Sequence, residues 1–317
     1  MKTKENVFIL ILIWIIIGLL CALIYKTVTN TPKKLPADYL AQKISYGESI
    51  NNVPSSLDKI VNNVISAQKG NIDNNNLDYN AQAPKTLSTS TTTKIDKSVR
   101  GLPILMYHFF YDKNNNTRSL DSNYTEISAF EEQMKYLSDN NYYYPTWDEV
   151  YDFVEGKKAL PQKSVVVTID DGDSTFFDLA VPILKEYNVK ATSFLITSVM
   201  NSETIAEYTS PILEFESHSD NMHRAGKNGK GIFLTISHDE AYNDLMASQK
   251  LLGLSEVFCY PFGDYNNFTK NMLIETGYKL AVTTNSGRVY PGMDPLILPR
   301  VRMSRGESLN SFISKVK

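Results

Sequence analysis

The 317-residue chain contains only two cysteines, Cys21 and Cys259, which lie far apart in the sequence. A disulfide framework is therefore excluded, and the chain does not depend on an oxidising compartment. Excess charge is lacking too, since the formal net charge is −3. Residues 1–34 hold five Lys and one Glu, which leaves about −7 on the remainder and excludes a general nucleic-acid footprint. No internal repeat is visible.

Charged residues are absent from Val7–Tyr25, an apolar run near the N-terminus. At about 1.5 Å per residue, a helix of this length nearly matches a ~30 Å hydrocarbon layer. The alternative is a cleavable signal peptide, but its apolar region is usually shorter and no small-x-small cleavage site follows here. We therefore expect residues 1–29 to form an uncleaved membrane anchor. Lysines flank both sides of the run, so charge alone does not set its orientation.

The stretch of residues 30–100 is polar and rich in Asn, Ser and Thr. Such a composition buries too little apolar surface to offset the entropy of ordering. We interpret it as a largely disordered spacer between the anchor and a folded domain at residues 101–317. The chain as a whole is 42% hydrophobic, enough for one sizeable core.

Candidate strands and helices alternate from Gly101 onward, which predicts the α/β class with a parallel sheet, open or closed into a barrel. Ser128 with Glu131, and Ser237 with Glu240, have capping-box spacing and predict two helix starts. Gly253 is suited to end the second of these helices. The expected strands are Pro103–Tyr107, Ser164–Ile169, Thr192–Ile196, Leu213–Glu216, Val257–Tyr260, Leu280–Thr283 and Ile297–Arg302.

Two adjacent acids, Asp170 and Asp171, follow the β-branched strand candidate at Ser164–Ile169 and are followed by Gly172. Adjacent strand residues point to opposite sides, so neighbouring acids can take different roles only where the strand ends. Gly172 permits the sharp turn that such an end requires. Taken alone, the motif is also what a solvated Asp-Asp-Gly turn looks like.

Two of the four histidines, His218 and His223, lie close together after the strand candidate at Leu213–Glu216. Residues five apart on a helix differ by about 140° and would not face one metal, whereas a loop at a strand end can turn both imidazoles to one point. With Asp171 they would form a one-carboxylate, two-imidazole set with open coordination positions. That set fits a catalytic Zn²⁺ site and equally a non-haem iron site. A surface histidine pair is the alternative.

Three motifs in order resemble the polysaccharide deacetylase family, carbohydrate esterase family 4. They are Thr168–Gly172 (TIDDG), the His-Ser-x-x-x-His of His218–His223, and Tyr260-Pro261-Phe262-Gly263. The resemblance covers about Leu102 to Arg302 and implies the family's distorted (β/α) barrel. The wide histidine gap, together with PILMYH at Pro103–His108, is similar to the poly-N-acetylglucosamine deacetylases of biofilm systems.

The resemblance also implies roles for individual residues. Asp171, His218 and His223 would bind the metal, and Asp170 would be the general base that takes a proton from the attacking water. His108 would protonate the leaving amine, and the backbone N–H of Phe262 would help to stabilise the oxyanion.

One feature of the family pattern is missing from the chain. The Arg that commonly precedes the Pro-aromatic-Gly motif and orients the base is absent, and Val257–Tyr260 stands there instead. We expect Arg300 to take over this role, because a guanidinium can hold a carboxylate in a fixed bidentate geometry.

The sequence therefore predicts a membrane-anchored polysaccharide N-deacetylase with its catalytic domain outside the cell. It would hydrolyse the amide of an N-acetylglucosamine polymer, release acetate and use a divalent metal, with Zn²⁺ expected. Poly-N-acetylglucosamine is the favoured substrate and peptidoglycan the alternative. A catalytically silent sugar-binding module is a further alternative, although the complete set of five acidic and histidine residues argues against it.

Overall fold

The computed structural model describes residues 95–226, 229–253 and 255–317. The expected anchor at Val7–Tyr25 and nearly all of the expected spacer at residues 30–100 lie outside this range. None of the helices in the described range is both long enough and apolar enough to cross a membrane.

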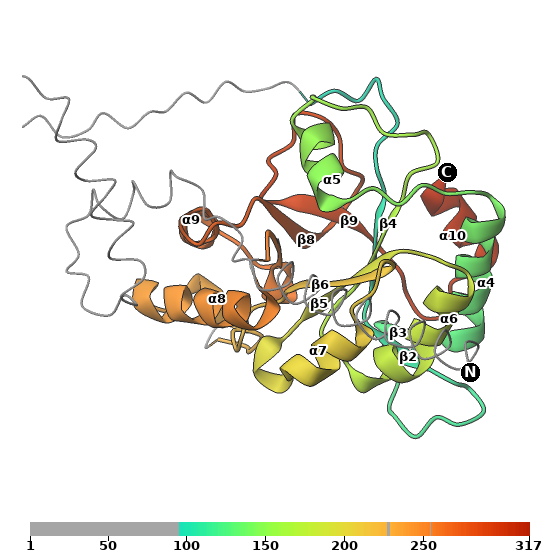
Figure 1. Ribbon diagram of the computed structural model, residues 1–317, viewed down its shortest axis with the longest axis horizontal. Helices are drawn as coiled ribbons and strands as arrows, with labels where there is room; N and C mark the ends of the chain where they lie inside the picture. The colour runs from blue at the N-terminus through green and yellow to red at the C-terminus, as the bar shows by residue number, and fades with distance from the viewer. Residues whose placement is uncertain (1–94, 227–228, 254) are drawn as a thin grey trace, which may run out of the picture. The chain divides into compact units, whose positions relative to one another are not determined.

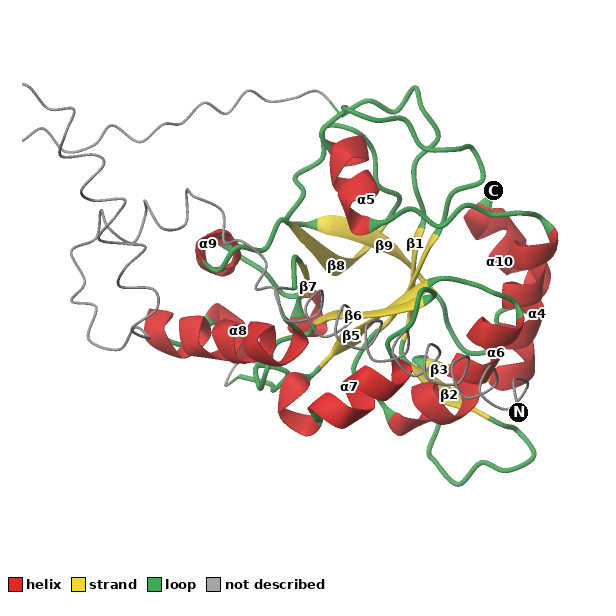
Figure 2. Cartoon of the chain, in the orientation of Figure 1, coloured by secondary structure: helices red, strands yellow, loops and turns green. Residues whose placement is uncertain are grey.

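Seven parallel strands close into a barrel, with β1 paired to both β4 and β9 (Figures 1 and 2). The α/β class and the parallel sheet expected from the sequence are confirmed, and each of the seven strand candidates overlaps an observed strand. In the order of the barrel these are β1 (Ile104–Tyr107), β4 (Val166–Ile169), β5 (Ala191–Leu195), β6 (Leu213–Ser217), β7 (Val257–Cys259), β8 (Leu280–Ser286) and β9 (Leu298–Arg302).

Burial on both faces explains why these strands lack polar alternation. Every residue of β1, β4 and β5 is buried, as is usual for parallel strands covered by helices. The register is continuous between β1 and β4, where Ile104 pairs with Val166 and Tyr107 with Ile169. Their carboxyl ends therefore lie side by side, which places the residues that follow them at one rim of the barrel.

Helices surround the barrel (Figure 2), and all of the α-helices except α7 bury residues against the rest of the domain. On one side α4 and α10 lie next to each other and share a core cluster with β1 and β4, in which Phe130 and Phe312 are fully buried. The α-helices are α4 (Ile127–Asp139), α5 (Trp147–Val154), α6 (Val181–Glu186), α7 (Ser202–Tyr208), α8 (His238–Leu252), α9 (Asn267–Glu275) and α10 (Leu309–Val316).

One of the two expected helix starts is confirmed and the other is wrong. Helix α8 has the Ser237–Glu240 capping box and ends at Gly253 with a left-handed φ of 72°. Helix α4 begins earlier than Ser128, because the side chain of Glu126 caps it by accepting from the Ala129 N–H. Glu126 is the last residue of β3 and has an extended backbone, so the chain passes directly from strand to helix.

A short parallel pair, β2 (Phe109–Tyr111) and β3 (Tyr124–Glu126), was not expected from the sequence. It lies outside the barrel and directly follows β1 and His108. Short helical turns follow three of the barrel strands. The π-helical turn η1 (Phe176–Ala180) follows β4, and the 3₁₀ turns η2 (Thr197–Val199) and η4 (Pro261–Gly263) follow β5 and β7.

Candidate active site

The acids and histidines singled out in the sequence meet at the carboxyl ends of the barrel strands. His108 follows β1, the Asp170–Asp171 pair follows β4, and His218 follows β6. This is the end at which parallel α/β barrels carry their chemistry. The strand-end turn has the form that the sequence indicated, with φ of 74° at Asp171 and 70° at Gly172. A Cβ on Gly172 would lie 2.6 Å from Leu195 Cδ2, so a larger residue would have to displace that side chain as well as adopt a left-handed backbone.

Asp171, His218 and His223 face a common point. Asp171 Oδ1 lies 3.3 Å from His218 Nε2 and 3.4 Å from His223 Nε2. One donor atom from each of the three residues lies within 4.8 Å of the other two, as the ligands of a single ion must. The five-residue step between the two histidines runs through a loop, as expected from the sequence.

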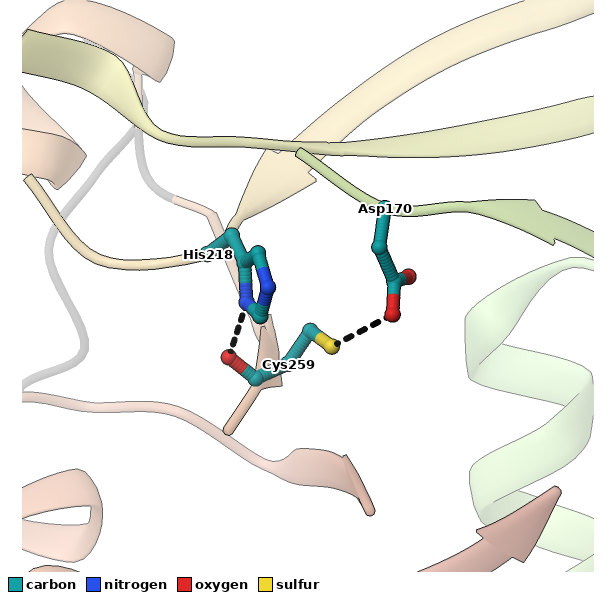
Figure 3. Close-up of side chains that lie close together, drawn as sticks. All are labelled: Asp170, His218 and Cys259. Atoms are coloured by element: carbon teal, nitrogen blue, oxygen red, sulfur yellow. Dashed lines mark hydrogen bonds between the residues drawn. The ribbon is translucent and has the colours of Figure 1, made fainter. Parts of the chain in front are cut away.

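His218 presents the nitrogen that a metal would need. Its Nδ1 lies 2.7 Å from the backbone carbonyl of Cys259, a contact shown in Figure 3. A carbonyl can only accept, so Nδ1 carries a hydrogen and a neutral His218 turns the lone pair of Nε2 toward Asp171. Asp171 Oδ1 is itself buried and makes no hydrogen bond to any described residue. Two acceptors facing each other in a buried site are what a bound cation would satisfy.

The pKa values of the two imidazoles are shifted in opposite directions. Burial works against protonation of His218, yet its pKa is raised well above the ordinary value by the neighbouring Cys259 and Asp171. A metal that binds at Nε2 of His218 would have to displace the proton favoured there. Burial and the nearby His218 lower the pKa of His223, which favours the neutral form that binds metals. The carboxylate and the two imidazoles therefore fit a divalent metal, and Zn²⁺ is among the ions that this donor set binds.

Arg300 holds Asp170 from inside the barrel. Its Nη1 donates to Asp170 Oδ1 at 2.7 Å and its Nη2 to Oδ2 at 2.6 Å, and both side chains are almost completely buried. Burial raises the pKa of Asp170, but the charge and hydrogen bonds of Arg300 outweigh it and keep this pKa well below the ordinary value. The bidentate contact expected from the sequence is present, and it keeps the carboxylate ionised.

A second donor set overlaps the first but fits a metal less well. Asp170, His218 and the Cys259 thiol also lie close together, and Figure 3 shows Cys259 Sγ beside Asp170, at 3.5 Å from Oδ2. Both oxygens of Asp170 already accept from Arg300, and the guanidinium would repel a cation at that place. Asp171 faces two imidazoles instead of a guanidinium, so the set that contains Asp171 is the better candidate.

His108 lies on another side of Asp170. Its Nε2 is 3.7 Å from Asp170 Oδ2, and its side chain is 14% exposed, so it remains open to a ligand at the rim. Burial lowers the pKa of His108, while the negative charges of Asp170 and Asp171 oppose that shift. No described residue accepts or donates a hydrogen bond at His108 Nδ1. The position suits a group that exchanges a proton with a substrate beside the acid pair.

Phe262 packs against one of the candidate metal ligands. Its ring stacks on His223 with centroids 4.5 Å apart, and the residue is 44% exposed. Its φ of 61° is left-handed, which is uncommon for a bulky residue and marks a backbone held by its surroundings. Gly263 follows with φ of 76°, and a Cβ there would lie 2.1 Å from Thr284 Oγ1. The oxyanion role of the Phe262 N–H stays a prediction.

Cys259 contacts both Asp170 and Arg300, and the sequence assigned no role to this residue. Arg300 Nη2 lies 3.3 Å from Cys259 Sγ, and the thiol in turn is next to Asp170. A signal was present, because Cys259 precedes the Pro-aromatic-Gly motif in the segment where the family carries its Arg. A residue there is expected to reach the base, even when its side chain is short.

Comparisons with known proteins agree on one family. Residues 157–281 match the family described as Polysaccharide deacetylase. YxkH of Bacillus subtilis (strain 168), which carries the name of a polysaccharide deacetylase, is 31% identical over 231 residues, which cover 71% of this chain and 78% of YxkH. A poly-beta-1,6-N-acetyl-D-glucosamine N-deacetylase of Staphylococcus aureus (strain MRSA252) is 28% identical over 194 residues, covering 56% of this chain and 67% of that protein.

Solved structures show the same fold. The Streptococcus pyogenes deacetylase PplD, in complex with acetate, superposes with a TM-score of 0.61 at 26% identity and covers 69% of this chain and 99% of PplD. IcaB from Ammonifex degensii superposes with a TM-score of 0.57 at 24% identity, covering 68% of this chain and 95% of IcaB.

Proposed function

This chain belongs to the polysaccharide deacetylase family, and from that premise we propose that it removes N-acetyl groups from poly-N-acetylglucosamine. The family's members hydrolyse N-acetyl amides with the help of a metal, so the enzyme class follows from membership. The choice of polymer is the proposal. Similarity to the Staphylococcus aureus enzyme supports it, as does the wide gap between His218 and His223.

The observation that carries the proposal is that the two adjacent acids have different partners. Asp171 Oδ1 faces the Nε2 atoms of two imidazoles, whereas the Asp170 carboxylate is held by Arg300 and remains ionised. We propose that Asp171, His218 and His223 hold a divalent metal, Zn²⁺ in the first instance. Such an ion, when bound, acidifies water and polarises the amide carbonyl.

The remaining steps fall to side chains that do not bind the metal. Asp170 would take a proton from the attacking water, since its low pKa keeps it available as a base. His108, on another side of Asp170, would give a proton to the nitrogen of the departing amine. The Phe262 N–H would stabilise the oxyanion of the tetrahedral intermediate. The exposed face of the Phe262 ring borders the same site.

Acetate release tests this function directly. The full-length protein, loaded with Zn²⁺, is incubated with poly-N-acetylglucosamine and with peptidoglycan, with and without chelator. We expect release from poly-N-acetylglucosamine that chelator abolishes and added divalent metal restores. Release from peptidoglycan alone would change the polymer and keep the enzyme. Binding of either polymer without release would indicate the silent sugar-binding module.

We also propose that Val7–Tyr25 anchors the chain in the cell membrane, with residues 30–100 as a spacer and the domain outside the cell. The absence of charge in Val7–Tyr25 and the extracellular nature of the polymer support this. Protease added to intact, wall-stripped cells should then degrade the domain while the full-length protein fractionates with membranes. A shorter protein, free in the medium and beginning after Tyr25, would show cleavage instead.

A further inference from the structure

The loop that carries both histidines has little regular structure of its own. Between His218 and His223, Ser219 has a left-handed φ of 72°. Two local bonds shape the loop: the Ser219 N–H donates to Ser217 Oγ, and the Met222 N–H donates to Ser219 Oγ, each at 3.1 Å. The middle of the loop must be fixed by other parts of the molecule.

One side of this loop is held by η2. The Thr197 N–H donates to the Ser219 carbonyl, and the Ser198 N–H donates to the Asp220 carbonyl, each at 3.1 Å. The hydroxyl of Thr197 also donates to Asp220 Oδ1 at 2.8 Å. Most of this support is backbone to backbone, and side-chain substitution would leave it in place.

The two amides in the middle of the loop are held by the carboxylate of Asp244 in α8. Its Oδ1 accepts from the Asp220 N–H at 2.7 Å, and its Oδ2 accepts from the Asn221 N–H at 2.8 Å. One turn further along the helix, Ser248 Oγ pairs with Ser217 Oγ at 2.7 Å. Helix α8 therefore contacts the chain on both sides of His218.

The helix is well built for this task. Its capping box and left-handed C-cap fix both ends, and Ala241, Leu245 and Ser248 are fully buried along one face. Asp244 lies on the same face by helical spacing. The contact is thus made from a rigid element, which is what precise placement of a binding loop requires.

We propose that Asp244 is a positioning residue that sets metal affinity, by fixing the Asp220–Asn221 backbone and thereby the relative placement of His218 and His223. The inference rests on the proposed metal-dependent function. Asp244 is not a ligand, and its carboxylate is suited to the task because each oxygen accepts one of two consecutive amides. An Asn side chain offers a single carbonyl oxygen, so it can satisfy only one of them.

The ionised Asp244 carboxylate does not stabilise the fold at neutral pH. Burial raises its pKa to about 6, against the opposing effect of the two amide hydrogen bonds. Since the folded pKa is above the ordinary value, the ionised carboxylate is disfavoured by folding at neutral pH. Removing the charge should therefore harm metal binding more than it harms stability.

The test measures metal affinity and stability separately on the full-length protein. Apo protein of the wild type, Asp244→Asn and Asp244→Ala is titrated with Co²⁺ against a competing chelator, and the visible Co²⁺ spectrum reports coordination geometry. The control is Asp239→Asn, the same change on the same helix at a side chain that is 93% exposed.

We expect affinity to fall about 10-fold or more for Asp244→Asn and further for Asp244→Ala, in the range that supporting residues of metal sites contribute. The Co²⁺ spectrum should change with it, while the apo melting temperature of Asp244→Asn stays near wild type and Asp239→Asn matches wild type throughout.

Unchanged Co²⁺ affinity in both Asp244 variants, beside a wild type that binds metal and releases acetate, would overturn the inference and leave the proposed function standing. An apo melting temperature that drops in Asp244→Asn without any change in affinity or spectrum would also overturn it, since the role would then be structural. A wild type that binds no metal would instead defeat the proposed function, and the inference with it.

Discussion

Replacement of Arg300 by Gln is expected to lower both the stability of the domain and its activity. The guanidinium is completely buried and donates to both oxygens of Asp170, to the Thr283 carbonyl at 2.9 Å and to Thr168 Oγ1 at 3.0 Å. Gln restores neither the charge nor the paired donors, so the Asp170 carboxylate would be left buried without a counter-charge. Breaking a buried pair in this way costs about 3–5 kcal/mol.

That cost has two measurable consequences. For a domain of this size it should lower the melting temperature of the apo protein by roughly 10 °C. It should also raise the pKa of Asp170 well above its value in the wild type, because only His108 and His218 would then oppose the effect of burial. Asp170 normally supports folding above its ordinary pKa, and this support is lost as pH falls through its lowered folded pKa. In the variant, protonation of Asp170 should instead favour the folded state toward low pH.

Activity should follow the same shift. The acid limb of the pH profile of kcat/KM for acetate release should move upward in Arg300→Gln, with a loss of about 10²-fold or more near neutral pH. Arg300→Lys keeps a charge but not the planar fork, and it should lie between the variant and the wild type. Arg302→Gln, on the same strand, serves as the matched control because its side chain donates to Asn123 rather than to the acids.

A double-mutant cycle provides the refuting result. Asp170→Asn and Arg300→Gln each leave one buried partner unsatisfied, so the double variant should lose less stability than the two single losses combined, with a coupling of about 2 kcal/mol or more. Additive losses, or an acid limb that stays in place in Arg300→Gln, would show that Arg300 does not hold Asp170 in the charged state.

Three further changes probe the rest of the chain. His223→Ala should lower Zn²⁺ content and acetate release together, and full metal occupancy of this variant in elemental analysis would remove His223 from the ligand set. His108→Ala should keep the metal and retain far more activity on an activated phenyl acetate ester than on N-acetylglucosamine oligomers, because a phenolate leaves without a proton; equal losses on both would contradict the acid role. The hydrogen bond with Lys158 is the main cause that lowers the pKa of Glu149 from 4.5 to about 2. The ionised Glu149 therefore stabilises the fold above pH 4.5, and this stabilisation is lost as the pH falls toward 2. Glu149→Gln should remove that part of the pH dependence in urea unfolding, and an unaltered acid profile would show that the contact adds nothing.

The strands and the acid pair could be predicted because their signals are local. The β-branched run before Asp170 is a buried parallel strand, and adjacent acids with different tasks require a strand end, which Gly172 provides. The location of Arg300 was also accessible, since a missing guanidinium must be replaced by another that can reach the same acid. The structure adds the distances that distinguish Asp170 from Asp171.

The features that escaped prediction depend on contacts between distant segments. Strands β2 and β3 are three residues long and exist because Phe109 and Tyr124 pair across a loop. Helix α4 starts at Glu126 rather than Ser128 because a strand delivers the chain directly into the helix. In the sequence, nothing distinguishes Asp244 from other polar residues of α8. Its two amide partners, Asp220 and Asn221, lie more than twenty positions earlier and are brought to it only by the fold.

Closure of the barrel has a consequence for how this enzyme matures. Strand β9, which carries Arg300, pairs with β1, which leads to His108, so the two strands that complete the ring come from opposite ends of the folded domain. During synthesis, Asp170, Asp171 and the three histidines of the site leave the ribosome before Arg300, whose guanidinium keeps Asp170 charged. A nascent chain that already contains every proposed metal ligand therefore still lacks the guanidinium that holds Asp170, the proposed base. Catalytic competence should arrive with the last strand, in a single step with the completion of the barrel.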